Sequence, residues 1–118
     1  VFSMLVQQGN PDPAFTFLEK FLPIQEGETK IIDVRYNFDE AYPELVGEEI
    51  AEIYTYRGSL TTPPCSESVL WMILKEPINA SAEQIELLQV LMPDNNYRET
   101  QPLNGRQVYL ETLTDEDF

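Results

Sequence analysis

The chain has 118 residues, of which 42% are hydrophobic and 24% charged, as expected for a single soluble globular domain with a modest core. Its 21 acidic and 7 basic residues give a net charge of -14, which argues against a nucleic-acid partner because phosphate binding requires clustered Lys and Arg. No apolar run approaches the ~20 residues that a membrane-spanning helix needs, so we expect no membrane span.

The counts of two residue types limit the chemistry further. The chain has no His, so it cannot itself supply a His general base, a His metal ligand or a Ser-His-Asp triad. It has one Cys, which excludes an intrachain disulfide. Cys65 is therefore a buried small side chain, a free thiol or half of a bridge to another chain.

The chain opens with an apolar run over residues 1–6, which ends in turn-forming residues at Gly9, Asn10 and Pro11. This pattern predicts a strand that is buried on both faces. A buried strand that starts at the first residue needs neighbouring segments, so we expect the start of the chain to lie inside a domain. No signal or transit peptide is visible.

Asp12 is expected to cap a helix that has Pro13 at its first position and ends before Pro23. The Phe and Leu residues of this helix recur at helical spacing, which is more typical of a core face than of a cofactor site. A short strand is expected over residues 31–34 and a loop over residues 36–48. Three acidic residues of that loop lack the spacing of a calcium-binding loop: Asp39, Glu40 and Glu44.

Two longer strands are expected over residues 50–56, where polar and apolar residues alternate, and over residues 66–75, which are mostly apolar. Between them, Ser and Thr hydroxyls follow Gly58 and precede Pro63 and Pro64. This layout fits a rigid loop that presents hydroxyls at the rim of an apolar pocket. A plain turn that leads into a buried strand explains it equally well.

A second helix is expected to start at Ser81, because Ser81 followed by Gln84 matches a capping box, and to run to about Met92. The same Ser81 completes a glycosylation sequon with Asn79, which matters only in a protein that a eukaryote secretes. Further along, Asn-Gly at 104–105 predicts a turn, and residues 107–110 predict a final strand. Because strands outnumber helices, we expect one mainly β layer with short peripheral helices.

Four stretches of the sequence resemble a known family in both order and spacing. They are Tyr56-x-Gly58-Ser59-Leu60-Thr61-Thr62-Pro63-Pro64-Cys65, Val69-x-Trp71, Lys75-Glu76-Pro77-Ile78 and Gln101-Pro102-Leu103-Asn104-x-Arg106. Together they resemble the C-terminal half of an α-class carbonic anhydrase, over Val1 to about Leu110. The resemblance implies that residues 1–118 are the C-terminal portion of a single domain. Its fold would be a large, twisted, mostly antiparallel sheet with peripheral helices.

The resemblance also implies a zinc cofactor at the bottom of a conical cleft. In the family three His hold the zinc, and they lie on strands that precede the point where this chain begins. This chain would therefore supply no metal ligand. An N-terminal half of the same domain, as a separate chain or a lost segment, would carry the ligands and the proton-shuttling residue. A homodimer is left open.

The resemblance implies a role for each residue of this chain that matches a functional position of the family. Thr61 resembles the threonine that orients zinc-bound hydroxide, accepting a hydrogen bond from it and donating one to a buried carboxylate. Thr62 resembles the neighbour that contacts bicarbonate or inhibitors. Four residues resemble the wall of the apolar carbon dioxide pocket: Val1, Leu60, Val69 and Trp71. Without the resemblance, these four would be expected to be ordinary core residues.

Other matched positions resemble structural residues of the family. Tyr56, Ser59 and Arg106 resemble hydrogen-bonding positions, and Pro63-Pro64 resembles a cis-proline site. Cys65 matches the position that secreted and periplasmic members use for a disulfide to a Cys near the N-terminus. The resemblance thus implies an extracellular or periplasmic location.

The expected function is zinc-dependent, reversible hydration of carbon dioxide to bicarbonate and a proton, with the N-terminal half completing the enzyme. The alternative is a catalytically inactive, carbonic-anhydrase-like binding or structural module. Within this chain Thr61, Val69 and Trp71 favour the enzyme. The presence or absence of the metal-binding His residues outside this chain decides between the two alternatives. The chain alone is expected neither to fold stably nor to bind zinc, because its first strand and sheet edges lack partners.

Overall fold

The computed structural model describes residues 1–21, 25–37, 41, 51–92 and 96–113. Within these residues the chain forms strands and two helices, which confirms the expected mainly β class with short helices. The elements are β1 (Phe2–Ser3), β2 (Val6–Gln8), α1 (Pro13–Glu19), β3 (Glu52–Gly58), β4 (Val69–Leu74), β5 (Ile78–Ala80), α3 (Ala82–Leu91) and β6 (Tyr109–Thr112). Neither helix is long and apolar enough to cross a membrane.

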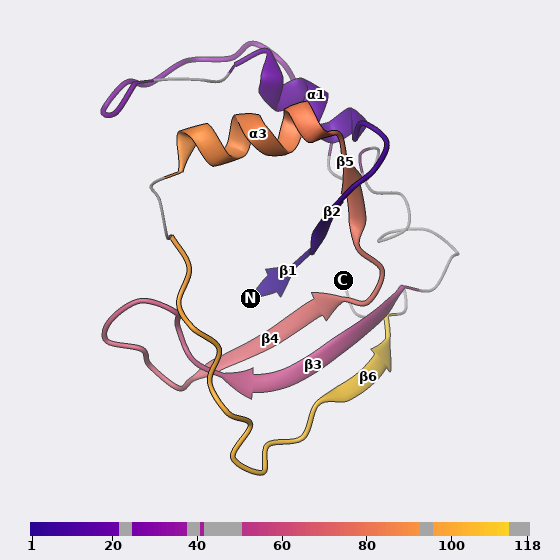
Figure 1. Ribbon diagram of the computed structural model, residues 1–118, viewed down its shortest axis with the longest axis vertical. Coiled ribbons are helices and arrows are strands. Elements are labelled where there is room, and N and C mark those ends of the chain that lie inside the picture. Colours follow the sequence, from indigo (N-terminus) through magenta and orange to yellow (C-terminus); the bar gives the residue numbers. More distant parts are fainter. Residues whose placement is uncertain (22–24, 38–40, 42–50, 93–95, 114–118) are drawn as a thin grey trace.

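The larger sheet has the strand order β1-β4-β3-β6, and Figure 1 shows it on the opposite side of the molecule from helices α1 and α3. Strand β3 runs antiparallel to β4 and β6, whereas β1 runs parallel to β4, so the sheet is mixed. The alternating residues over β3 and the apolar run over β4 thus form neighbouring strands of a hairpin, joined by residues 59–68.

The register of the sheet decides which side chains share a face. Tyr56 lies opposite Trp71, and Gly58 opposite Val69, so all four occupy one face of the sheet. Phe2 pairs with Met72 in the neighbouring parallel strand. Because side chains alternate along a strand, Val1 lies on the face of Trp71 and Val69, which we call the site face.

The opposite face of the sheet carries the core. Ile53 is 2% exposed and Leu74 is 4% exposed, and both pack with Ala14 from helix α1. Phe2 and Met72 pack partly buried against the same cluster. The core therefore lies between α1 and the sheet, and it leaves the site face free.

The expectation of one strand over residues 1–6, buried on both faces, is wrong. The run is divided into β1 and β2, which pair with β4 and β5. Ile78 N donates to Leu5 O at 2.9 Å, so the pairing continues across the break. Val1 is 53% exposed and Leu5 is 54% exposed, because no described segment covers the site face there.

Both helices start as their capping residues predict. Asp12 Oδ1 accepts from Ala14 N at 2.7 Å, and Ser81 forms a complete capping box with Gln84. Gln84 also accepts from Asp12 N at 2.9 Å and donates to Asp12 O at 3.0 Å. One buried amide therefore links the starts of α1 and α3.

Two other features of the strands differ from expectation. Residues 31–34 form no strand, and Ile31 is 97% exposed, because this segment pairs with no described strand. Strand β5 was not expected, because Pro77 indicated a strand end and Asn79 a cap or sequon. The acidic residues Asp39, Glu40 and Glu44 lie outside the described residues.

Candidate functional site

The hydroxyl-bearing loop between β3 and β4 is closed by its own backbone. Leu60 N donates to Ser66 O at 3.0 Å across its base, and Cys65 N donates to Thr62 O at 2.9 Å across its tip. The Pro63-Pro64 bond is cis, as the resemblance implies. Cys65 adopts a positive φ of 56°, which turns the chain back towards β4. The loop is thus a closed, turned structure with Thr61 between its base and its tip.

Trp71 holds the start of this loop. Its indole Nε1 donates to Ser59 O at 3.1 Å, and its ring stacks on Tyr56 with 6.4 Å between ring centroids and 10° between the planes. A Cβ at Gly58 would lie 3.0 Å from Trp71 Cδ1 and 3.1 Å from Tyr56 Cε2. A side chain at this position would therefore be crowded by the two rings, which would have to shift by a few tenths of an ångström. Trp71 is both an apolar surface and a hydrogen-bond donor to the loop.

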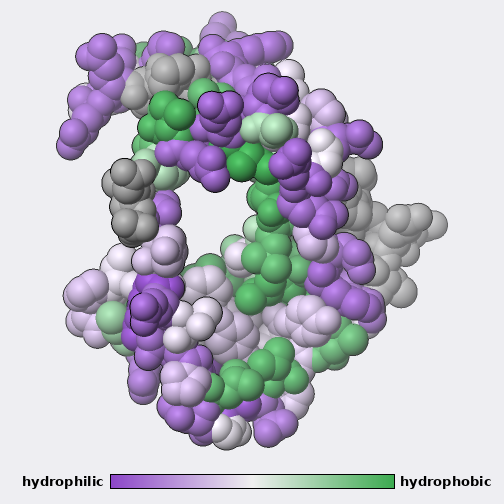
Figure 2. Space-filling view, in the orientation of Figure 1, coloured by the Kyte–Doolittle hydropathy of each residue, from purple (hydrophilic) through white to green (hydrophobic). Residues whose placement is uncertain are grey.

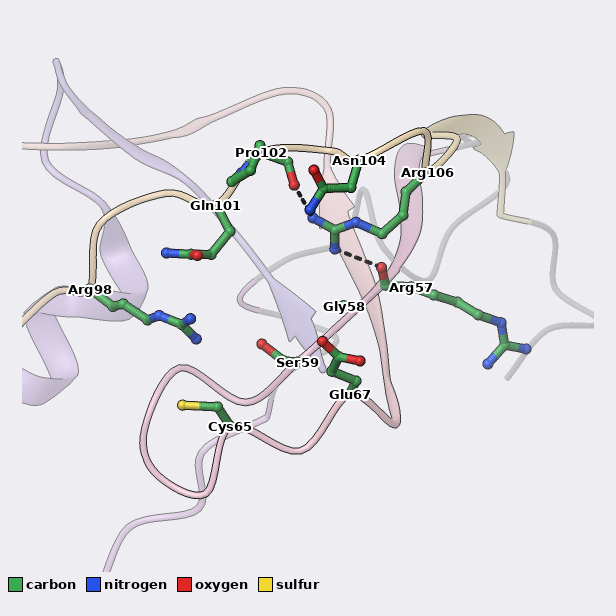
Figure 3. Close-up of a pocket in the computed structure, with 10 residues that line it drawn as sticks. All are labelled: Arg57, Gly58, Ser59, Cys65, Glu67, Arg98, Gln101, Pro102, Asn104 and Arg106. Carbon is green, nitrogen blue, oxygen red and sulfur yellow. Dashed lines mark hydrogen bonds between the residues drawn. The ribbon is translucent and has the colours of Figure 1, made fainter.

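Arg106 fastens the segment that follows helix α3 to strand β3. Its guanidinium donates to the carbonyl oxygens of Arg57 at 3.0 Å, Pro102 at 3.0 Å and Leu103 at 2.9 Å. Figure 3 shows the first two of these bonds. Arg106 Cζ also lies 5.8 Å from the centroid of the Tyr56 ring, in a cation–π contact. Arg106 thus binds three backbone carbonyls and one aromatic ring.

The turn before Arg106 forms as its residues predict. Asn104 has a φ of 51° and Gly105 a φ of 80°, and Arg106 N donates to Leu103 O at 3.0 Å. The turn places the Arg106 side chain beside Tyr56.

A cavity of about 500 Å³ opens beside the stacked rings. Five of the residues expected at the site line it: Tyr56, Ser59, Thr61, Trp71 and Arg106. Leu5 and Tyr54 add apolar wall from β1–β2 and β3. Thr61 and Trp71 therefore line one shared space, although they lie on different elements.

The remaining expected residues lie around this cavity without lining it. Val1 and Val69 share the site face with Trp71 through the sheet register. Leu60 is 40% exposed and sits next to Thr61 in the loop. Thr62 and Pro64 lie exposed at the loop tip.

A second cavity of about 370 Å³ lies behind the loop, and Figure 3 shows its lining residues. Cys65 is a free, half-buried thiol in its wall. Arg98 and Gln101 reach into this cavity from the segment between α3 and β6, whereas the Arg57 side chain points away. Arg98 also lines the first cavity, as do Gly58, Ser59, Gln101 and Arg106, so the two cavities share part of their walls.

Sequence reasoning did not single out Arg98. It lies three positions before the Gln101-Pro102-Leu103-Asn104 stretch that carried the resemblance. A single Arg in a polar loop carries no signal of its contact in the fold, so only the structure identifies it.

The described residues do not form a metal centre. None of their His, Cys, Asp and Glu side chains gather in a group of three that could hold a metal ion. The chain also has no His in its full sequence. The residues that the structure describes therefore do not fit a zinc site by themselves.

The model of the eukaryotic-type carbonic anhydrase family matches residues 1–112. The chain belongs to the carbonic anhydrase family. Alpha carbonic anhydrase 3 of Arabidopsis thaliana is 36% identical over 117 residues, covering 93% of this chain and 40% of that protein. Human carbonic anhydrase 12 is 34% identical, covering 92% of this chain and 33% of that protein. The resemblance drawn from the loop motifs is confirmed.

Solved carbonic anhydrases share the fold. The α-carbonic anhydrase of Thermovibrio ammonificans, solved with the inhibitor sulfanilamide, superposes with a TM-score of 0.74 and 35% identity. The match covers 89% of this chain and 44% of that one. The Photobacterium profundum α-carbonic anhydrase gives a TM-score of 0.72, 36% identity and coverages of 89% and 46%. The chain thus spans less than half the length of each of these relatives.

Proposed function

We propose that residues 1–118 are the C-terminal portion of one carbonic anhydrase domain, and that the completed protein catalyses reversible hydration of carbon dioxide. One observation carries this proposal. Thr61 and Trp71 line the same cavity, in a chain that the family model matches over residues 1–112. The intact Thr61 and Trp71 disfavour the alternative of an inactive binding or structural module.

The apolar part of the site suits an apolar gas. The proposed carbon dioxide wall consists of Val1, Leu60, Val69 and Trp71. In its support, Val1, Val69 and Trp71 share one sheet face, and this face is not used by the core. A wall of this kind holds an uncharged molecule through contact and exclusion of water, without a charged group.

Thr61 is the proposed polar counterpart of this wall. A hydroxyl can both donate and accept a hydrogen bond, so it can fix the direction of an oxygen nucleophile. Its neighbour Thr62 is the proposed contact for bicarbonate, since its exposed hydroxyl lies on the same loop. The loop that carries both is held by Trp71 and by its own backbone bonds.

Zinc is the proposed cofactor, with its ligands outside this chain. Zinc in proteins is bound by His, Cys and carboxylate side chains, and the described residues gather no such set. An N-terminal portion of the domain is therefore the proposed source of the ligands.

The exposed apolar side chains of the site face also support the proposal that an N-terminal portion of the domain packs against this chain. Val1, Leu5 and Leu110 are each more than half exposed, as is unusual for large apolar residues of a sheet. Figure 2 shows apolar surface in a green band along the side where β1, β2 and β5 lie. The N-terminal portion is the proposed cover for this surface, and a homodimer is the competing occupant. A cooperative melt of the isolated chain as a monomer would contradict the need for either partner, and a cooperative melt as a dimer would favour the homodimer.

Cys65 is the proposed attachment point for that portion. The thiol is free and half-buried in the wall of the second cavity, where a Cys of another segment could reach it. Such a bridge requires an oxidising compartment, so an extracellular or periplasmic location belongs to the same proposal. Intact mass with and without reductant tests it: reduction releases a separate partner chain, or adds the mass of two hydrogens where the bridge joins two parts of one chain, and an unchanged mass excludes the bridge.

The activity itself is tested on the intact protein. We expect bound zinc and sulfonamide-sensitive carbon dioxide hydration, followed with a pH indicator. Thr61→Ala should lower kcat/KM by roughly 10–100-fold, the usual effect of removing a group that orients a metal site. Thr112→Ala removes an exposed hydroxyl from β6 and should leave kcat/KM unchanged. Absence of zinc together with absence of sulfonamide-sensitive activity would reject the proposed enzyme.

A further inference from the structure

The two peptide carbonyls that precede Thr61 are each held by a side chain from another part of the chain. Trp71 Nε1 donates to Ser59 O at 3.1 Å. Arg98 Nη1 donates to the next carbonyl, Leu60 O, at 3.3 Å, over a separation of 38 residues. The backbone that leads into Thr61 is thus held from strand β4 on one side and from the segment before β6 on the other.

The base of the Arg98 side chain is itself anchored. Arg98 belongs to the stretch between α3 and β6, which Arg106 joins to strand β3 through its bond to Arg57 O, while its bonds to Pro102 O and Leu103 O lie within the stretch itself. In Figure 3 the Arg98 side chain extends from this stretch towards the loop that carries Ser59 and Cys65. A donor that projects from a fastened segment can hold the loop in a defined place, because its own position does not drift with the loop.

Within the described part of the chain, the Arg98 guanidinium forms no ion pair with an acidic side chain. The one ion pair there joins Lys75 and Glu52, away from the loop. A planar guanidinium with several N–H donors is also better suited than an ammonium to hold a carbonyl in a fixed direction. The Leu60 carbonyl is therefore its specific contact on the loop.

We propose that Arg98 is a positioning residue, which orients the Thr61 hydroxyl by holding the Leu60 carbonyl. The effect on turnover rests on the proposed function, whereas the effect on the loop does not. Without the bond, the peptide between Leu60 and Thr61 loses one of its constraints, and the Thr61 side chain is held less firmly beside the cavity. The loop then keeps the bond from Trp71 to Ser59 O and its own backbone bonds.

The test uses the intact protein and three variants. Arg98→Met keeps a long side chain and removes the donors, and Arg98→Lys keeps a cationic donor. Arg57→Met is the matched control, because the Arg57 side chain points away from the cavity. Hydrogen exchange is followed at the amides of Leu60 and Cys65, whose bonds close the loop. Carbon dioxide hydration is measured per active site, with thermal unfolding alongside.

In Arg98→Met we expect faster exchange at Leu60 and Cys65, unchanged exchange in β3 and β4, and an unchanged melting temperature. We also expect kcat/KM to fall about three- to tenfold, the factor that one net hydrogen bond represents. Arg98→Lys should restore part of both effects, and Arg57→Met should match the parent. This pattern is specific to positioning, since a general loss of stability would accelerate exchange throughout the sheet.

Unchanged exchange at Leu60 and Cys65 in Arg98→Met would overturn the proposal, and so would acceleration spread evenly over β3 and β4. In an active parent protein, an unchanged kcat/KM would also overturn it. A parent protein without carbon dioxide hydration would reject the proposed function instead. In that case, faster exchange confined to the loop would still support the Arg98 contact.

Discussion

Trp71→Phe separates the two contributions that Trp71 makes to the site. The substitution removes the indole N–H that donates to Ser59 O at 3.1 Å, and it keeps an aromatic ring to stack on Tyr56. One net hydrogen bond contributes about 0.5–1.5 kcal/mol to stability. The smaller ring also buries roughly 20–40 Å² less apolar surface at this half-buried position, which adds about 0.5–1 kcal/mol. We therefore expect the free energy of unfolding to fall by about 1–2 kcal/mol.

Urea unfolding of the intact protein measures this loss, and carbon dioxide hydration measures its consequence at Thr61, two residues after Ser59. Activity per active site should fall, because the carbonyl at the start of the loop is released. Val90→Ala is the control: Val90 is 74% exposed on α3, and its truncation should change stability by less than about 0.5 kcal/mol. A Trp71→Phe protein with unchanged unfolding free energy and unchanged kcat/KM would refute the proposed hold on the loop.

Two further predictions concern elements away from the cavity. Gln84→Ala should lower the free energy of unfolding by about 2–4 kcal/mol without changing kcat/KM, because it leaves the buried backbone N–H and C=O of Asp12 without this partner; denaturation and activity assays check both parts, and an unchanged midpoint would contradict it. The hydrogen bond from Lys75 to Glu52 raises the pKa of Lys75 above its ordinary value of 10.5. The stability from this pair is therefore present below pH 10.5 and is lost as pH rises through the raised pKa, so thermal unfolding across alkaline pH should show a loss that Glu52→Gln lacks.

Local chemistry predicted the helix starts and the tight turn. Asp12 and the Ser81–Gln84 pair cap their helices through bonds within a few residues, and Asn104-Gly105 adopts positive φ values that few other residues tolerate. Each of these features depends on groups close in sequence. Their structural outcome can therefore be inferred without knowing the rest of the fold.

Strand pairing was less predictable. The apolar residues over 31–34 satisfy a strand pattern, yet Ile31 is almost fully exposed, because no described strand lies beside them. Strand β5 has a weak pattern, and it forms because β2 supplies the hydrogen-bond partners of Ile78–Ala80 from the start of the chain. A strand forms only where another segment supplies its hydrogen-bond partners, and the residues of the strand do not show which segment that is.

The sequence by itself determined the family, the loop with its hydroxyls and the absence of His from this chain. These depend on residue identity and spacing, which can be read directly. Only the tertiary structure decided that Val1 shares a face with Val69 and Trp71, that the Trp71 indole holds Ser59, and that Arg98 reaches Leu60. The physical reason is that a carbonyl accepts from whichever donor the fold brings within about 3 Å. The donor and acceptor residues are 12 and 38 positions apart in the sequence, so no local sequence pattern indicates that they form a hydrogen bond.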